Sequence, residues 1–453
     1  MAGAKGTYII KDGRNPRDVA LFALMNINNS GRKSNVFLRE TLDRNQELSV
    51  RDKALCEHIV SATLDHLFSI DAILSEYSKT PTAKMNPYIR EILRLSVCQL
   101  LFMDRVPAPS VINEGTELAK IHGISGLSGF VNGVLRNISR DNEKIRSGNA
   151  SEAAEETKLT RVMKEGYIRY SVPKWLYHKF LMDFGLKAAE SIFSSWLLLR
   201  KTSVRMNLSK GLSEEEIRRM IEEEGIGCEM ISGSPAVCEL SGLSGTGVGS
   251  LRAFREGYIT VQDLSASMLT TYCPPSRGDM VLDLCAAPGG KSLSYADAME
   301  GTGTVHARDI SEQKVSLIRE NALRCGFGNI ITEVADASVL DRGFLGKADI
   351  VVADLPCSGL GVVAKKPDIK KNVRPETILE LVSLQRSILE NAVQYVKPGG
   401  RLCYSTCTVT REENEENASY IADNFGLRPL LMKRIWPDEH RDGFFIAVFE
   451  KKA

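Results

Sequence analysis

The chain has 453 residues, more than one hydrophobic core usually organises, so two or three domains are expected. Its 43% hydrophobic and 25% charged residues are typical of an ordinary globular protein, and no apolar run is long enough to span a bilayer. The net charge of +1 excludes a globally basic protein, so any surface that binds nucleic acid has to be local.

The N-terminus and the cysteines narrow the class of protein further. The first stretch, MAGAKGTYIIKDGRNP, lacks a secretory core segment, which predicts a cytoplasmic protein. The ten cysteines are scattered without CxxC pairs or Cys/His clusters. This spacing argues against a zinc site and against a disulfide framework, so we expect no bound metal and thiols that are free for chemistry.

About 140 residues at the start of the chain have the pattern of an all-helical domain. Asn15 can cap a helix that begins at Pro16, and Ser49 opens a capping box before a helix whose apolar stripe runs to Leu67. Further helical stripes follow at 88–103, 110–122 and 130–138. Residues 1–140 carry a net charge of +4, which is mild support for a surface that faces a polyanion, although on charge alone a solvated helical face is the better explanation.

A polar, charged stretch separates this region from a smaller mixed one. Residues 141–160 contain almost no large apolar side chains, which is typical of a linker or a solvated helix. Beyond them, Ser213 with Glu216 has the pattern of a capped helix. Short strands are predicted at 204–208, 228–231 and 258–261.

The segment VLDLCAAPGGKS, residues 281–292, has the pattern of a strand that enters a nucleotide-binding turn. Apolar strand formers precede Pro288, which fixes the turn. Gly289 and Gly290 would let a ligand approach the backbone before Lys291 begins a helix. On the glycines alone, a tight turn without a ligand is about equally plausible.

The repeat of strand, helix and acid after this turn favours a binding site. A strand at 304–308 ends at Asp309, and a strand at 330–334 is followed by Asp336. In a doubly wound α/β fold the ligand crevice lies outside the carboxyl ends of the strands, and an acid about twenty residues after the glycines accepts hydrogen bonds from ribose hydroxyls. Any one of these acids is more often a cap or a turn residue, but their regular recurrence favours ligand contact.

Two cysteines follow predicted strands of the same sheet. The strand at 348–354 ends at Asp354 and is followed by Cys357. A Pro-Gly-Gly turn precedes the strand at 401–407, which ends at Cys407. Because the carboxyl ends of parallel strands meet at one edge, both thiols are expected in the crevice of the glycine loop. Strand exits rich in Pro, Ser, Thr and Gly leave a thiol accessible and its pKa adjustable.

These motifs resemble known families over nearly the whole chain. VRDKALCEHIVSATLDHL, YIREILRLSVCQLLFMDRVPAPSVINEGTELAK and GFVNGVLRNISR resemble the NusB-like RNA-binding helical domain. DLCAAPGGKS, DLPCSG and YSTCT followed by REENEEN resemble the RNA cytosine-carbon-5 methyltransferases that use S-adenosylmethionine. Together they are similar to the RsmB (Sun/Fmu) family, which methylates a cytosine of bacterial small-subunit ribosomal RNA. The departures are Ser292, where threonine is common, Lys371, where tryptophan is frequent, and the segment 440–443.

The resemblance implies a multidomain protein. Its expected parts are an all-α NusB-like RNA-binding domain (1–145), a linker (146–165), a small α+β RNA-binding or connecting domain (166–260) and a doubly wound, Rossmann-like α/β methyltransferase domain (261–453). It further implies RNA as the partner, S-adenosylmethionine as the cofactor, no DNA or membrane contact, and a monomer.

The resemblance also implies roles for particular residues. The expected cofactor contacts are Cys285, Ala286, Ala287, Pro288, Gly289, Gly290, Lys291, Asp309, Asp336 and Asp354. Cys407 is the implied nucleophile, Cys357 the candidate for assisting product release, and Asp354 and Lys291 further catalytic contacts. The chemistry alone leaves the nucleophile open, because DNA cytosine methyltransferases use the cysteine of a Pro-Cys dipeptide, which would name Cys357.

Two alternatives differ in class. The chain could methylate another RNA, most plausibly transfer RNA, and the NusB-like front favours the ribosomal substrate. It could also be a non-catalytic RNA-binding or antitermination-type factor, against which the intact Cys357, Asp354 and Cys407 argue.

Overall fold

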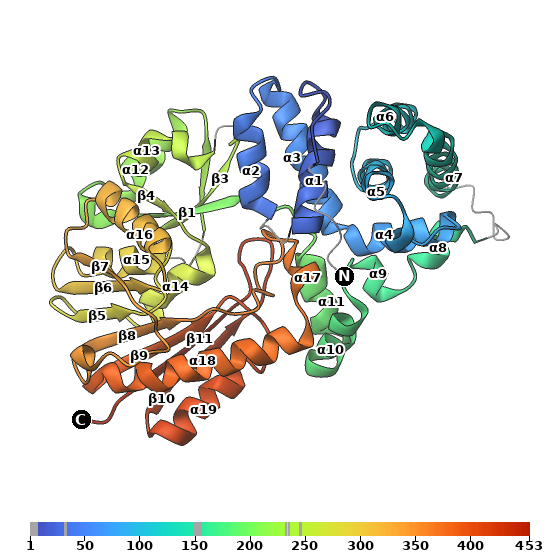
Figure 1. The fold of residues 1–453 in the computed structure, drawn as a ribbon. Helices are drawn as coiled ribbons and strands as arrows, with labels where there is room; N and C mark the ends of the chain where they lie inside the picture. Colours follow the sequence, from blue (N-terminus) through green and yellow to red (C-terminus); the bar gives the residue numbers. More distant parts are fainter. Residues whose placement is uncertain (1–7, 31–33, 148–155, 232, 234–235, 244–246) are drawn as a thin grey trace. The chain divides into compact units, whose positions relative to one another are not determined.

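The computed structural model describes residues 8–30, 34–147, 156–231, 233, 236–243 and 247–453 (Figure 1). The chain divides into two compact units, Met1–Leu197 with Lys366–Asn372, and Leu198–Lys365 with Val373–Ala453. The predicted domain boundaries at 145, 165 and 260 stay predictions, and residues 148–155 of the predicted linker lie outside the described part. Across the described ranges, none of the helices combines the length and the apolar character needed to cross a bilayer.

The first unit is helical, as predicted. Its α-helices are α1 (Pro16–Ser30), α2 (Ser34–Arg44), α3 (Val50–Asp65), α4 (Leu67–Tyr77), α5 (Pro87–Leu101), α6 (Ala108–Ile121), α7 (Ser128–Arg146), α8 (Lys158–Val162), α9 (Gly166–Arg169), α10 (Lys174–Phe184), α11 (Leu186–Ser195) and α17 (Ile369–Asn372). Helix α5 packs against α1, α3, α4, α6 and α7 and is buried almost all round, so it is the centre of this core. Asn86 starts it by accepting a hydrogen bond from the Tyr88 amide (2.9 Å).

The segment after Ser49 that was predicted to be one helix forms two helices. The apolar stripe that starts at the Ser49 cap was expected to run through Leu67 in a single helix, but α3 ends at Asp65 and α4 begins at Leu67. His66 forms the junction, with non-helical φ and ψ of −102° and 16°, and its ring stacks on Phe102 with 3.9 Å between the centroids. The stripe continues across the break because Leu67 remains buried.

Seven residues from the second half of the chain, 366–372, belong to this helical unit. Lys370 is 1% exposed, and its ammonium group donates to the Asp65 carbonyl (2.6 Å). Ser34 donates to Asp368 (2.5 Å), and Lys371 donates to the Asn28 carbonyl (2.8 Å). Burial lowers the pKa of Lys370, because the surroundings solvate its charge poorly.

The second unit contains a small antiparallel sheet in the order β2-β3-β1-β4. Its strands are β1 (Thr202–Met206), β2 (Gly227–Met230), β3 (Val237–Ser241) and β4 (Ile259–Val261), and its helices are α12 (Glu214–Glu222) and α13 (Arg252–Arg255). The Ser213 capping box is confirmed: the Ser213 hydroxyl accepts from the Glu216 amide, and the Glu216 carboxylate accepts from the Ser213 amide. Strand β3 was not predicted, although it pairs with both β1 and β2.

The larger sheet has seven strands in the order β10-β11-β9-β8-β5-β6-β7. They are β5 (Met280–Asp283), β6 (Thr304–Asp309), β7 (Ile330–Val334), β8 (Ala348–Asp354), β9 (Val396–Thr406), β10 (Arg428–Ile435) and β11 (Phe444–Glu450), joined with α14 (Leu264–Tyr272), α15 (Gly290–Ala298), α16 (Glu312–Cys325), α18 (Pro375–Tyr395) and α19 (Glu415–Phe425). Strands β5 to β9 are parallel, whereas β11 runs antiparallel to β9 and to β10. The chain moves outward from β5 in one direction and from β8 in the other, so the switch point lies between them.

Helices cover both faces of this sheet (Figure 1). Val281 packs with residues of α14, α15 and α16, while its neighbour Leu282 packs with residues of α18 and α19. This alternation follows from the two-residue period of a strand. It explains why β5 and β8, in the middle of the sheet, are apolar on both sides and carry their acids near their ends.

One strand start was predicted wrongly. The Pro-Gly-Gly triplet at 398–400 was expected to be a turn before a strand at 401, but β9 begins at Val396 and contains the triplet. The register to β8 shifts between Ala348 and Ile350, so the triplet is an irregularity within the pairing.

Replacing Lys370 should show whether the 366–372 segment is part of the helical core. Lys370→Ala leaves the Asp65 carbonyl without its donor and removes a buried side chain, so the free energy of unfolding should fall by about 1–3 kcal/mol. Lys370→Met should lose less, because it keeps most of the volume, and Lys366→Ala, at an exposed position, should lose nothing. Urea denaturation of the full chain followed by circular dichroism measures this, and equal stability of the two alanine variants would contradict it.

Candidate active site

The loop between β5 and α15 turns tightly around Gly289. Its φ of +107° is a conformation that glycine adopts without strain, and its amide donates to the Ala286 carbonyl (2.7 Å). A side chain there would press on the backbone of Ile318, 3.4 Å away. The predicted glycine turn is therefore present, with Cys285, Ala286, Ala287 and Pro288 forming the loop that leads into it.

Two acids at the ends of β5 and β6 stabilise this loop and the helix that follows it. Asp283, at the end of β5, is fully buried and accepts a hydrogen bond from the Ser292 hydroxyl (2.7 Å). Burial raises the pKa of Asp283 to about 7. Asp309, at the end of β6, accepts from the Ala287 amide (3.0 Å) and from Lys314 (2.9 Å). Asp309 thus joins the cofactor loop to the start of α16.

The third predicted acid lies farther out. Asp336 follows β7, is exposed, and accepts hydrogen bonds from the amide and hydroxyl of Ser338. These bonds lower the pKa of Asp336. The backbone connects it to the second acid, because the Ala335 amide donates to the Asp309 carbonyl (2.9 Å).

An ion pair crosses the switch point. Lys291, in the first turn of α15, lies 2.6 Å from Asp354 at the end of β8. The other oxygen of Asp354 accepts from the Ser405 hydroxyl on β9 (2.7 Å). Burial acts to lower the pKa of Lys291, but the Asp354 carboxylate outweighs it and the pKa is raised, so the lysine stays charged.

The two thiols of the predicted site are adjacent. The sulfur atoms of Cys357 and Cys407 are 3.3 Å apart, and both residues are half-buried. The hydrogen bond between the two thiols and burial together raise the pKa of Cys357 well above its usual value. Cys285, also half-buried, has its pKa raised by burial, which makes it an unreactive thiol.

Glu413 organises the loop that carries Cys357, and the sequence pattern did not single it out. It is fully buried and accepts from the Ser358 amide (2.8 Å), the Ser358 hydroxyl (2.6 Å) and the Thr410 hydroxyl (2.7 Å). Gln385 on α18 donates to it as well (3.1 Å). The sequence feature that could have pointed to Glu413 is the stretch REENEEN, but this run of acids does not indicate which of the side chains is buried.

Unpaired polar atoms beside the loop fit a bound ligand. Among the described residues, the amide nitrogen of Gln262 and one oxygen of Asp283 are buried without a hydrogen-bond partner. The Gln262 side chain lies against Gly290, within 4.0 Å of where a Cβ atom would stand. A cofactor with an amino acid end and ribose hydroxyls would meet these groups and the Asp309 carboxylate, so the residues fit S-adenosylmethionine.

Comparisons with known proteins agree with this geometry. Residues 270–450 match the family described as 16S rRNA methyltransferase RsmB/F, and residues 14–140 match the NusB family. The probable ribosomal RNA small subunit methyltransferase B of Bacillus subtilis is 34% identical over 96% of this chain and 99% of its own length. Its counterpart from Synechocystis is 29% identical with the same coverage of both chains.

Solved structures extend the likeness to three dimensions. The crystal structure of PH0851 has a TM-score of 0.77 and 25% identity, covering 99% of this chain and all of its own. NSun6 from Pyrococcus horikoshii shares the fold over 62% of this chain and 98% of its own, with a TM-score of 0.57 and 21% identity. The predicted family and fold class are confirmed. The chain belongs to the ribosomal RNA small subunit methyltransferase B family and is an RNA methyltransferase that uses S-adenosylmethionine.

Proposed function

We propose that this enzyme transfers a methyl group to carbon 5 of a cytosine in small-subunit ribosomal RNA through a covalent adduct with Cys407. The observation that supports this most directly is the pair of thiols, 3.3 Å apart, beside the Lys291–Asp354 ion pair at the carboxyl edge of the sheet. Two thiols and one charged pair are the groups that addition to a pyrimidine ring and release from it require.

The chemistry explains the need for a nucleophile. Carbon 5 of cytosine attacks poorly, but addition of a thiolate to carbon 6 makes the ring enamine-like, and carbon 5 then becomes the nucleophile. S-adenosylmethionine supplies the methyl group as a sulfonium substituent. Asp354 is the group we assign to ring nitrogen 3: when that nitrogen takes up a proton from solvent during the addition, the carboxylate accepts a hydrogen bond from it and stabilises the protonated ring.

The proton distribution in the thiol pair favours Cys407 as the attacking group. Because the pKa of Cys357 is raised well above its usual value, Cys357 keeps its proton and can donate a hydrogen bond to a Cys407 thiolate. Lys291 interacts electrostatically with Cys407 and carries a positive charge, which stabilises that thiolate further. This supports the assignment that the family resemblance implies over the one that the Pro-Cys dipeptide implies.

The same arrangement supports a role for Cys357 in release. After methyl transfer, the proton on carbon 5 is lost to solvent, its electron pair restores the ring double bond, and the bond between carbon 6 and the Cys407 sulfur breaks. The electron pair returns to that sulfur, and the Cys357 S–H, next to it in the free enzyme, stabilises the departing thiolate by a hydrogen bond. Without Cys357 the adduct should therefore persist.

The helical unit is the part that we assign to RNA capture. A target base has to be turned out of its stack to reach the thiols, and this unstacking costs a few kcal/mol of free energy. Binding of the flanking RNA has to offset that cost. A cleft of about 580 Å³ between α6 and α7 is lined by Arg136, Arg140, Asn113 and Asn132, which suit phosphate oxygens. Both arginines are exposed, and each is oriented by a hydrogen bond to a neighbouring asparagine.

The role assigned to Asp309 can be tested by binding. Asp309→Ala removes the carboxylate proposed to hold the ribose hydroxyls, so S-adenosylmethionine affinity should fall by about 1–3 kcal/mol in isothermal titration calorimetry. Asp423→Ala, an exposed acid on α19, serves as the control and should bind normally. Unchanged affinity in Asp309→Ala would mean that the carboxylate only braces the loop through Ala287 and Lys314.

The roles of the two thiols can be distinguished because Cys407 is proposed to act in the attack and Cys357 in the later release. Incubated with small-subunit ribosomal RNA and S-adenosylmethionine, the wild type should produce 5-methylcytosine, mapped by sequencing of the RNA. Cys407→Ala should produce none, while cofactor and RNA binding persist. Cys357→Ala should accumulate a protein–RNA adduct that survives denaturing electrophoresis. An adduct formed by Cys407→Ala but not by Cys357→Ala would reverse the assignment, and unmethylated ribosomal RNA with the wild type would contradict the proposed function.

The proposed RNA surface predicts a change in salt dependence. If Arg136 and Arg140 each neutralise a phosphate, the Arg136→Gln, Arg140→Gln double variant should flatten the slope of log affinity against log salt by about 1.4–1.8. Cofactor affinity should stay the same. Arg428→Gln, which breaks an exposed pair with Glu450, is the matched control. An identical slope for the double variant and the wild type would exclude this cleft as a phosphate-binding surface.

A further inference from the structure

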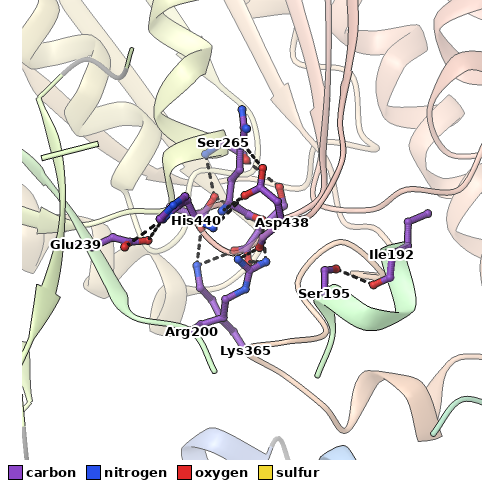
Figure 2. A network of polar contacts seen from close by, with 11 residues as sticks. Ile192, Ser195, Arg200, Glu239, Ser265, Lys365, Asp438 and His440 are labelled. Carbon is purple, nitrogen blue, oxygen red and sulfur yellow. Dashed lines mark hydrogen bonds and ion pairs between the residues drawn. The ribbon is translucent and has the colours of Figure 1, made fainter. Parts of the chain in front are cut away.

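The loop between β10 and β11 is anchored by side chains from several elements of the second unit (Figure 2). Arg200, which precedes β1, donates to the Arg441 carbonyl (2.7 Å) and to the Asp438 carbonyl. Glu239 on β3 accepts from the His440 ring (3.2 Å). The small sheet therefore contacts this loop at two points.

The end of the loop is held by a charged cluster. Lys365 places its ammonium group between two carboxylates, 2.5 Å from Asp263 and 2.8 Å from Asp442. Asp263, the N-cap of α14, accepts from the Ser265 amide (2.8 Å) and from the Asp442 amide (3.3 Å). The Ser265 hydroxyl donates to the Asp442 carbonyl (2.8 Å). Asp442 is thus fixed through its side chain, its amide and its carbonyl.

The backbone continues from this cluster to the nucleophile in two hydrogen bonds. The Gly443 amide donates to the Gly361 carbonyl (2.8 Å), and the Gly361 amide donates to the Cys407 carbonyl (3.0 Å). The approach is close, because a Cβ atom on Gly361 would stand 1.9 Å from the Gly443 oxygen and 2.8 Å from the Cys407 oxygen. Gly361 and Lys365 belong to the loop that also carries Cys357, so one loop connects both thiols to the cluster.

We propose that Lys365 and Asp442 are positioning residues that set the place of the Cys407 thiol relative to Cys357. This inference rests on the proposed function of Cys407 and goes beyond it by assigning residues that touch neither thiol. The ion pair fixes the segments on both sides of the Gly443–Gly361 hydrogen bond. When it is broken, these segments separate, and the Cys407 backbone loses the donor that holds it.

Charge is essential to this arrangement. Asp442 is 3% exposed, and the nearest cation after Lys365 is Arg200, whose nitrogen is 3.9 Å from it. Without Lys365, Asp263 and Asp442 would be two like charges in a buried site, and they would separate or one of them would take up a proton. An arginine at 365 keeps the charge between them, whereas a methionine keeps only the volume.

Lys365→Met and Asp442→Asn should each lower kcat for RNA methylation by about ten- to a hundredfold, because a misplaced nucleophile slows the chemical step. The KM for RNA and the affinity for S-adenosylmethionine should stay within about twofold of the wild type, since uniform binding is unchanged. Lys365→Arg should restore most of kcat. The double variant should be no slower than the slower single variant, because both changes break one interaction.

A matched control comes from the other edge of the same sheet. Lys397 at the start of β9 pairs with Asp349 at the start of β8, far along the strands from the thiols, and Lys397→Met should leave kcat unchanged. Introduced into Cys357→Ala, Lys365→Met should slow formation of the covalent adduct by the same factor as kcat.

The outcomes are distinguishable. A kcat that survives Lys365→Met, additive losses in the double variant, or an equal loss in Lys397→Met would overturn the positioning role while leaving the proposed function standing. A wild type without 5-methylcytosine product would instead contradict the proposed function itself. Thermal denaturation of each variant separates misplacement from unfolding, and Lys365→Arg keeps the test decisive if Lys365→Met does not fold.

Discussion

The structure depends on the ion pair between Lys291 and Asp354. Lys291 follows the glycine turn after β5, and Asp354 ends β8, so the pair joins the two halves of the sheet at the point where the chain reverses direction. Both side chains are mostly buried, and loss of one partner would leave the other charge uncompensated, which typically costs several kcal/mol. Ser405 ties Asp354 to β9, and Cys407 follows two residues later. The same carboxylate therefore closes the switch point and orients the strand that leads to Cys407.

Around this pair, irregular backbone is stabilised by polar groups at the carboxyl edge. A loop that is buried has to satisfy its own amides and hydroxyls, because water cannot. Glu413 does this for the Cys357 loop, Asp309 for the cofactor loop and the Lys365 cluster for the loop before β11. Each network contains acids that accept from several donors rather than from a single partner, and such networks are rigid because no member can move without leaving another unsatisfied. Within this edge the sulfur atoms of Cys357 and Cys407 lie 3.3 Å apart.

The parts that could be predicted from the sequence are those with a local cause. Strands such as Ala348–Asp354 are short apolar runs ending at an acid, and the glycine turn requires φ values that few residues adopt, so both were placed correctly. The features that were predicted wrongly, or not predicted at all, depend on contacts between residues that are far apart in the sequence. The Pro-Gly-Gly triplet has the pattern of a turn but lies within β9, where the register to β8 shifts. The apolar stripe past Asp65 crosses a break at His66, whose ring stacks on Phe102. Glu413 resembles its exposed neighbours until tertiary contacts bury it.

The loop after Cys357 ends where the chain passes from the second unit to the first. Lys365 is bonded to Asp263 and Asp442 in the second unit, and the next residue, Lys366, already belongs to the helical unit. Five residues beyond Lys365, Lys370 is buried among the helices. The two carboxylates around Lys365 fix the end of the loop that starts at Cys357, so Gly361 and the Cys407 carbonyl are held by contacts within the second unit.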